Sequence, residues 1–307
     1  MGSTEDRLLG ALAVAVAASI WGTLGLFAKI LYAQGVSFES LVAVRASVGW
    51  LAVIGFLLAT QGARSLRVSL RDFVLLLPLG LVGIGTFYLL YFYTVRESTV
   101  GTAAILLYSA PAFVVVLAWL FLKEPLNAAK VFALLLTVGG IFLVVGAYDP
   151  ANLEVRPKVL LTGLLSGLTY GLYAIFGRPL AGHGHLSPAV ILSYALAFGS
   201  AMLVVTALPT LDTLAGLPAG SYALLLMLAV VHTTLAFALY TFGIRHLGAG
   251  RAAIIATIEP VVAGILGVIL LGEEMTALKV LGALLVLAGA VLAQVRPGKA
   301  LPRSGPS

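Results

Sequence analysis

An internal repeat is the feature of this sequence that most restricts its fold. Shifting the chain by 149 residues superposes two related segments, with 15 identities in 43 ungapped positions between residues 101 and 143. Repeats of this kind in an apolar chain are typical of transporters, whose two related halves enclose a central site. Equivalent positions include Gly101 and Gly250, Pro111 and Pro260, Tyr91 and Tyr240, Trp21 and Tyr170, and Glu124 and Glu273.

Composition places the chain in a lipid bilayer. Of its 307 residues, 61% are hydrophobic and 10% are charged, with a mean hydropathy of +1.11, whereas soluble proteins carry about 25% charged residues. Such a chain cannot cover its surface with polar groups in water, so we expect an all-α integral membrane protein. The net charge of +6 falls in short loops between apolar stretches and does not indicate nucleic acid as a partner. The sequence has no cysteine, which excludes disulfides and cysteine-based metal sites.

A membrane helix requires about 20 apolar residues, and the sequence offers ten such stretches. They group into a first five-helix repeat at 8–147 and a second at 157–295. The segment 296–307, rich in Gly, Pro and basic residues, is predicted to be a disordered cytoplasmic tail. The predicted spans are 8–33, 37–60, 73–95, 98–122, 126–147, 157–181, 187–208, 220–246, 249–272 and 276–295.

Basic residues give the expected orientation, because Lys and Arg accumulate in cytoplasmic loops. Four fall on the side opposite the N-terminus, namely Arg96, Arg156, Lys158 and Lys279. Twelve fall on the side of the N-terminus: Arg7, Arg64, Arg67, Arg71, Lys123, Lys130, Arg178, Arg245, Arg251, Arg296, Lys299 and Arg303. Both termini are therefore predicted to be cytoplasmic, in a multi-pass protein of the inner (plasma) membrane. Because each repeat has an odd number of spans, the second is predicted to be inverted relative to the first.

Related segments in the two halves carry a resemblance to a known family. Together with Ser19-Ile-Trp-Gly22, these segments resemble the EamA-type branch of the drug/metabolite transporter (DMT) superfamily. The resemblance covers both repeats and nearly the whole chain. Within that superfamily the chain is most similar to the bacterial aromatic amino acid exporter. The resemblance implies export of amino acids and small metabolites through a cavity lined by helices 1, 3, 4, 6, 8 and 9 of ten. The segments are Leu107-Tyr-Ser-Ala-Pro-Ala-Phe113 with Phe121-Leu-Lys-Glu124, and Ala253-Ile-Ile-Ala-Thr-Ile-Glu-Pro-Val-Val262 with Leu270-Leu-Gly-Glu273.

Three charged residues within the predicted spans are considered for a functional role. Glu259 is roughly 15 Å into the ninth span, where a carboxylate is costly and marks a functional candidate; a structural carboxylate paired with a neighbouring helix is the alternative. Arg45, in the second span, needs carboxylate or carbonyl partners. Glu259 or Glu39 could pair with it. An interhelical tie is favoured over a substrate-carboxylate clamp, since the second helix is not among the cavity helices that the resemblance implies. Lys29 is expected to extend to the lipid headgroups.

Aromatic residues with polar tips gather in spans 1, 3, 4, 6 and 8. Trp21, Tyr108 and Tyr170 lie too deep for the interfacial belt of Trp and Tyr, so we expect them to face a cavity. Aromatic walls suit flat or apolar substrates and cations. His232, in the middle of span 8, is either a substrate ligand or a hydrogen-bonded core histidine. The predicted substrate-binding residues are Trp21, Tyr88, Tyr91, Tyr108, Tyr170, His232, Tyr240 and Glu259.

Pro111 and Pro260 are predicted hinges. Each removes an amide from the middle of a span and frees the carbonyl four residues earlier, at Leu107 and Ala256. Half-helices that can rock about these points would close one cavity mouth at a time, as alternating access requires. A static kink is the alternative.

Other residues at spaced or terminal positions are expected to be structural. Gly163, Gly167 and Gly171 form two GxxxG steps in the sixth span and predict close helix packing. Glu124 and Glu273 follow the ends of their spans and are expected to cap the next helix.

The sequence therefore predicts a secondary or facilitative transporter, not an enzyme, which exports neutral and aromatic amino acids and related metabolites by alternating access. Export of other small organic metabolites or drugs is the main alternative, with an intramembrane enzyme or a non-transporting scaffold as more distant ones. A proton is a candidate coupling ion, and facilitated diffusion is left open. No metal or cofactor is expected, because His183 and His185 alone make a poor zinc site.

Overall fold

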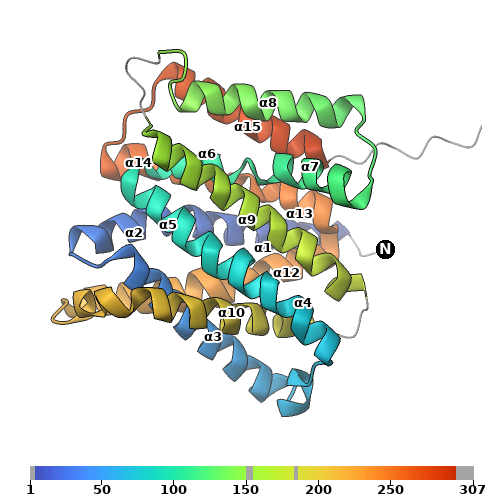
Figure 1. Cartoon of the computed structure of the whole chain (residues 1–307), viewed down its shortest axis with the longest axis vertical. Coiled ribbons are helices and arrows are strands. Elements are labelled where there is room, and N and C mark those ends of the chain that lie inside the picture. The colour runs from blue at the N-terminus through green and yellow to red at the C-terminus, as the bar shows by residue number, and fades with distance from the viewer. Residues whose placement is uncertain (1–3, 150–154, 183–185, 295–307) are drawn as a thin grey trace, which may run out of the picture.

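The computed structural model describes residues 4–149, 155–182 and 186–294. The tail at 296–307 and the pair His183 and His185 lie outside these ranges. The described residues are helical and contain no β-strand, which confirms the all-α fold (Figure 1). The helices are α1 (Thr4–Gly22), α2 (Leu24–Ala33), α3 (Phe38–Thr60), η1 (Ala63–Leu66), α4 (Leu70–Gly80), η2 (Leu81–Thr86), α5 (Phe87–Glu97), α6 (Val100–Leu107), α7 (Ala110–Leu122), α8 (Ala128–Val144), α9 (Pro157–Gly182), α10 (Pro188–Ala207), η4 (Leu208–Leu214), α11 (Ala219–Ala229), η5 (Val230–Leu235), α12 (Ala236–Leu247), α13 (Ala249–Ala256), α14 (Ile258–Leu271) and α15 (Ala277–Gln294).

Nine helical segments in the described part of the chain are long and apolar enough to cross a bilayer. The span expected at 126–147 forms the shorter apolar helix α8. It begins only at Ala128, because the Asn127 side chain accepts from the amide of Lys130 at 2.9 Å and caps the helix there. Its 17 residues cover about 25 Å at 1.5 Å per residue, which is less than the roughly 30 Å of the hydrocarbon core.

The backbone departs from α-helix at equivalent positions in the two repeats. The expected fourth and ninth spans are each broken into two helices, α6 and α7 around Tyr108–Ser109, and α13 and α14 around Thr257. The π-helical turns η2 and η5 are separated by the repeat distance of 149 residues. Such turns are frequent at functional sites.

Packing contacts also recur between the repeats. Helices α8 and α15 lie side by side (Figure 1). A Cβ added at Gly140 would lie 2.5 Å from the Gly282 carbonyl oxygen and 2.7 Å from the Val286 side chain. The repeat-equivalent Gly289 meets Ala133 and Thr137 in the same way, with 2.7 Å to the Ala133 oxygen. The two halves therefore make matching contacts with each other.

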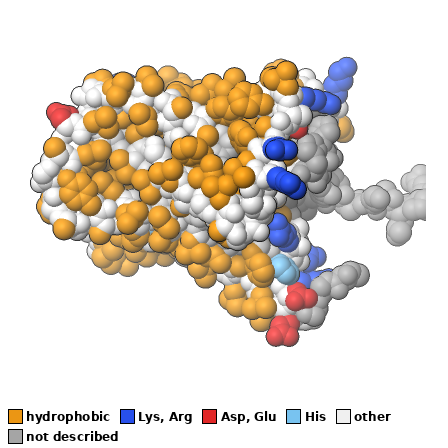
Figure 2. Space-filling model, turned by 90° about the horizontal axis from the view of Figure 1, so that it is seen from below, with side chains coloured by type: hydrophobic (Ala, Val, Ile, Leu, Met, Phe, Trp, Pro, Cys, Tyr) orange, Lys and Arg blue, Asp and Glu red, His pale blue; other side chains and the backbone are white. Residues whose placement is uncertain are grey.

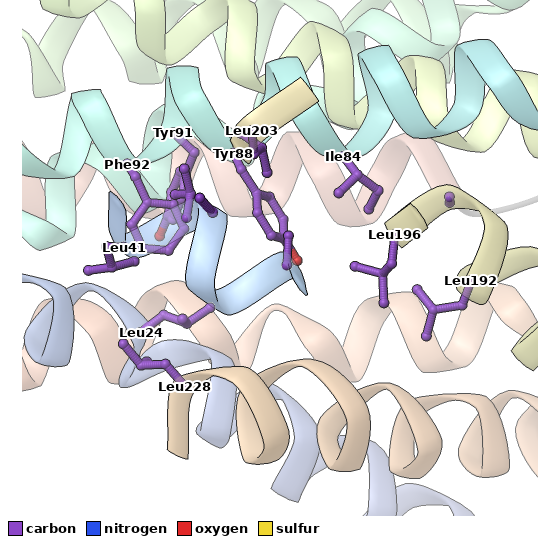
Figure 3. Close-up of a cluster of buried hydrophobic side chains, with 14 of the residues drawn as sticks. Leu24, Leu41, Ile84, Tyr88, Tyr91, Phe92, Leu192, Leu196, Leu203 and Leu228 are labelled. Carbon is purple, nitrogen blue, oxygen red and sulfur yellow. The ribbon is translucent and has the colours of Figure 1, made fainter. Parts of the chain in front are cut away.

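The largest buried cluster draws on helices from both halves, including α2, α3, α5, α10 and α11. Figure 3 shows Tyr88, Tyr91 and Phe92 of α5 within it, with Leu24 and Leu228 below them in the view. The three glycines of the sixth span contact α6 and α7, as the GxxxG spacing predicts: Gly167 lies against the Leu106 carbonyl and Gly171 against the Ala110 carbonyl. This packing fixes α9 against the broken helix of the first half.

Substituting Gly140 tests the close approach of α8 and α15. We expect Gly140→Ala to lower the free energy of unfolding by about 1–3 kcal/mol, the usual cost of overpacking. Gly139→Ala is the matched control, because a Cβ on the adjacent residue meets no atom within 4 Å. Thermal unfolding of the purified protein in detergent measures both. Equal shifts for the two variants would contradict this packing.

Candidate functional site

A cavity of about 520 Å³ lies at the centre of the molecule, between helices of both repeats. All eight residues predicted to bind substrate line its wall. The wall also includes residues of α3, α10 and α15, which corrects the expectation that only helices 1, 3, 4, 6, 8 and 9 contribute. The aromatic, charged and hydrogen-bonding side chains on the wall include Trp21, Arg45, Phe87, Tyr88, Tyr91, Tyr108, Tyr170, Tyr173, His232, Thr233, Phe237, Tyr240 and Glu259.

The aromatic part of the wall follows the repeat. The ring centroids of Trp21 and Tyr240 are 5.3 Å apart, and those of Phe87 and Tyr170 are also 5.3 Å apart. Tyr170 is 46% exposed although it lies in the middle of a helix, because it faces the cavity. The repeat-equivalent aromatic pairs on the wall are Trp21 with Tyr170, Tyr88 with Phe237, and Tyr91 with Tyr240.

Glu259 begins the second half of the broken ninth span. The hydroxyl of Tyr108 lies 2.6 Å from the carbonyl oxygen of Ala256 and 3.2 Å from Glu259 Oε2. Pro260 has no amide to offer the Ala256 carbonyl, so the tyrosine of the opposite repeat takes the place of that missing donor. Glu259 forms no ion pair within the described residues, and its carboxyl group lies at the cavity wall beside the Tyr108 hydroxyl.

Arg45 of α3 is 5% exposed and reaches the cavity wall. Its Nε donates to Thr233 Oγ1 at 3.2 Å, and its guanidinium carbon lies 4.4 Å from the centroid of the Tyr88 ring. The expected pairing with Glu259 or Glu39 is wrong, because within the described residues Arg45 makes no ion pair. The bond to Thr233 does tie α3 to η5. The cation–π contact and the Thr233 bond hold the side chain instead.

His232 lies in the π-helical turn η5 and is 2% exposed. Its Nε2 is 2.7 Å from Thr23 Oγ1, and Thr23 Oγ1 is 2.7 Å from the carbonyl oxygen of Ile20. A hydroxyl has one proton, so both short contacts are satisfied when Nε2–H donates to Thr23 and Thr23 donates to Ile20. The His232 carbonyl accepts from Trp21 Nε1 at 2.9 Å. His232 thus holds Trp21 and Thr23 in place.

The remaining sequence candidates lie at different depths. Pro111 is on the cavity wall, whereas Pro260 faces a separate gap of about 40 Å³. Lys29 is off the cavity wall, and its Nζ donates to the Arg96 carbonyl at 3.1 Å, at the C-terminal end of α5. This position agrees with a lysine that extends toward the headgroups.

The two ends of the molecule differ. At the end where α6 begins (the α6 end), Glu273 Oε1 lies 2.6 Å from the amide nitrogen of Val100, and Oε2 lies 3.3 Å from that of Gly101. Glu273 therefore caps a helix of the other repeat, and the expectation that it caps the following helix is wrong. Glu124 does contact the following helix, through Lys130 at 3.3 Å, but Asn127 is the residue that caps it.

The cavity is closed at the α6 end and extends toward the opposite end. The gap beside Glu273 has a volume of about 40 Å³. In the other direction the wall reaches Gln294, the last described residue of α15, near the start of α13 (the α13 end). Figure 2 shows Lys and Arg side chains gathered at one end of the face in view.

Charge on the cavity wall is sparse and balanced. Arg45 and Glu259 are the only Lys, Arg, Asp or Glu residues among the described residues that line it. In the same part of the chain no group of three His, Asp or Glu side chains is arranged to hold a metal ion. The wall therefore offers one cationic and one anionic contact on an aromatic surface.

Sequence reasoning missed several wall residues. Phe237 is the repeat equivalent of Tyr88 and could have been found from the offset alone. Phe87 and Tyr173 adjoin predicted residues in their helices. Thr233 had no detectable signal, because its place on the wall depends on the π-helical turn.

Comparison with known proteins agrees with this architecture. A sequence profile of the EamA-like transporter family matches residues 8–146 and 157–294. An "Uncharacterized transporter" of Archaeoglobus fulgidus is 30% identical, covering 92% of this chain and 96% of its own. The "Uncharacterized inner membrane transporter YicL" of Salmonella typhimurium is 28% identical, covering 95% and 96%. A crystal structure with 19% identity has a TM-score of 0.62 over 95% of this chain and 97% of its own, which shows a common fold. With both halves matched, the chain belongs to the EamA-like transporter family of membrane proteins.

Proposed function

We propose that this transporter carries small zwitterions, with neutral and aromatic amino acids first among them, and exports them by alternating access. The observation that carries the proposal is the pair Arg45 and Glu259, the only two charged residues on the described cavity wall, neither of them neutralised by an ion pair. A free amino acid carries one group of each charge. The cavity volume of about 520 Å³ is within the range of small-molecule sites.

Each charged group has a matching role. Thr233 occupies only the Nε of Arg45, which leaves the two terminal nitrogens to donate to a carboxylate as a bidentate pair. Glu259 lies on the cavity wall and accepts from the substrate ammonium. The sequence favoured an interhelical tie for Arg45, whereas this arrangement makes Arg45 the main ligand of the substrate carboxylate. Tyrosine hydroxyls are then secondary ligands of that carboxylate.

The aromatic wall favours a flat or apolar side chain. Offset stacking adds about 0.5–1.5 kcal/mol per ring pair beyond burial, so affinity is modest and release is easy. Phosphorylated metabolites would need two or more cations, and Lys29 bonds to Arg96 away from the cavity. An organic cation would leave Arg45 without a partner. Other metabolites or drugs are the alternative cargo, and a proton on Glu259 is the candidate coupling ion.

The proposed architecture has ten membrane helices in two inverted five-helix repeats, with both termini in the cytoplasm. The matching α8–α15 contacts support the repeat relation. Figure 1 supports the inversion, because α1 and α9, the first helices of the two repeats, start at opposite ends of the molecule. The basic residues at one end in Figure 2 support a cytoplasmic α13 end.

Transport by purified protein tests the cargo. Proteoliposomes carrying the intact chain should exchange labelled phenylalanine faster than empty liposomes. Arg45→Gln and Glu259→Gln should each lower the exchange rate about tenfold or more, since a hydrogen bond to a charged group is worth about 1.5–3 kcal/mol. Glu39→Gln is the control, because Glu39 shares helix α3 with Arg45 but is off the cavity wall.

Competition shows which group meets which charge. In Arg45→Gln, 3-phenylpropionate should lose its ability to inhibit residual exchange while phenethylamine keeps it, and Glu259→Gln should give the reverse. If wild-type liposomes pass no amino acid faster than empty ones, the cargo assignment is wrong and the metabolite alternative replaces it.

The hinge proposal concerns the two repeat-equivalent prolines. Pro111→Ala and Pro260→Ala restore an amide that can bond the carbonyls of Leu107 and Ala256, so the half-helices should stiffen and transport should slow more than stability changes. Pro78→Ala is the control, since this proline lies inside α4 and off the cavity wall. Full transport by the Pro111→Ala, Pro260→Ala double variant would refute the hinge proposal. The two prolines would then only produce static kinks in their helices.

Single cysteines test the topology, because the chain has none of its own. Ala63→Cys in η1 and Ala215→Cys after η4 both occupy exposed positions outside the long helices. A membrane-impermeant maleimide added to intact cells should label Ala215→Cys and leave Ala63→Cys unlabelled until the membrane is permeabilised. The opposite pattern would refute the proposed orientation.

A further inference from the structure

We propose that Glu273 and Glu124 are a pair of gating residues, one at each end of the cavity, which engage in alternate states of the transport cycle. The proposal rests on alternating access in the proposed function, but on none of the cargo assignment. It starts from the cap that Glu273 places on α6, a helix of the other half.

The Glu273 contact closes the α6 end. A carboxylate at a helix N-terminus accepts from amides that have no partner within the helix and meets the positive end of the helix dipole. Here Glu273 takes the amides of Val100 and Gly101, while Thr99 Oγ1 accepts from the amide of Thr102 at 3.0 Å. A Cβ added at Gly101 would lie 3.5 Å from Gly264 Cα. Glycines thus allow α6 and α14 to meet closely beside the carboxylate.

The turn that presents this carboxylate is duplicated in the first half. Glu273 follows Gly272, which has a left-handed φ of 66°, and its amide donates to the Gly267 carbonyl at 3.0 Å. Glu124 follows Lys123, with a left-handed φ of 55°, and its amide donates to the Ala118 carbonyl at 3.2 Å. These two segments lie at the repeat offset of 149 residues. The backbone of each half is therefore built to hold a glutamate in the same position.

The side chains differ between the halves in this state. The repeat equivalent of the Gly101 amide is that of Gly250, near the start of α13, and the described part of the chain supplies it with no hydrogen-bond partner. The nearest atom to a Cβ added at Gly250 would be the Gln294 oxygen, at 3.8 Å. Glu124 instead contacts Lys130 and is 41% exposed at its side chain. Glu273 latches the α6 end, whereas the cavity wall reaches the α13 end.

Applying the repeat relation gives the opposite state. When the α13 end closes, α7 approaches α13 as α14 now approaches α6, and Glu124 leaves Lys130 to cap the amide of Gly250. Glu273 then releases α6, and the α6 end opens. Because each latch joins a helix of one half to a helix of the other, the two glutamates set the balance between the states.

Labelling rates of single cysteines in detergent test this balance without substrate and without assuming a topology. Ile105→Cys faces the closed gap and Ala253→Cys faces the cavity. Glu273→Gln should raise the maleimide labelling rate of Ile105→Cys about 3- to 30-fold, the range expected for losing one charge–dipole cap, and lower that of Ala253→Cys. Glu124→Gln should shift both rates the other way. Glu39→Gln, which lies off both the gap and the cavity wall, is the control and should change neither.

Disulfide trapping gives a second measurement with both glutamates intact. Gly101→Cys with Gly264→Cys should cross-link readily under a mild oxidant, and their repeat equivalents Gly250→Cys with Val115→Cys should cross-link in the opposite state. Adding Glu124→Gln should slow the second reaction, and adding Glu273→Gln should speed it. Unchanged or parallel shifts in labelling, or a second pair that never cross-links while the first does, would overturn the proposal. If the wild-type protein carries no amino acid but the variants still shift the labelling rates as expected, the cargo assignment alone is refuted and the gating proposal stands.

Discussion

Hydrocarbon offers no hydrogen-bond partner, so every backbone group released within the bilayer has to be satisfied by the protein. Pro260 releases the carbonyl of Ala256, and the Tyr108 hydroxyl donates to it from the broken helix of the other half. The same hydroxyl lies 3.2 Å from Glu259. A single side chain thus stabilises an irregular backbone and joins the two halves beside the acidic group of the cavity.

The cavity combines a symmetric wall with asymmetric charge. Aromatic residues recur at the repeat offset, whereas Arg45 corresponds to Tyr194, Glu259 to Ala110 and His232 to Gly83. A symmetric wall presents similar apolar surface to either end of the molecule, which suits a substrate that enters from one side and leaves from the other. One cation and one anion, neither with a charged repeat equivalent, would hold a zwitterion in a single orientation through the cycle.

Much of the fold could be predicted from the sequence, because a lipid bilayer requires long apolar helices. The internal repeat also shows each helix and each special residue position twice. All eight residues predicted to bind substrate line the cavity, since aromatic and ionisable side chains at bilayer depth have few other places to go. Arg45 was misjudged because its direction depends on the rotation of α3 and on Thr233. The π-helical turns have no sequence signature, and the cap by Glu273 joins residues about 170 positions apart in the chain.

A cryo-EM structure of the protein in nanodiscs with saturating phenylalanine would test most directly whether this cavity holds a zwitterion. We expect density for one amino acid on the aromatic wall, with its carboxylate at the terminal nitrogens of Arg45 and its ammonium at Glu259. An empty cavity at a concentration that supports transport would contradict the assignment. A bound phenylalanine whose charged groups contact neither residue would contradict it equally.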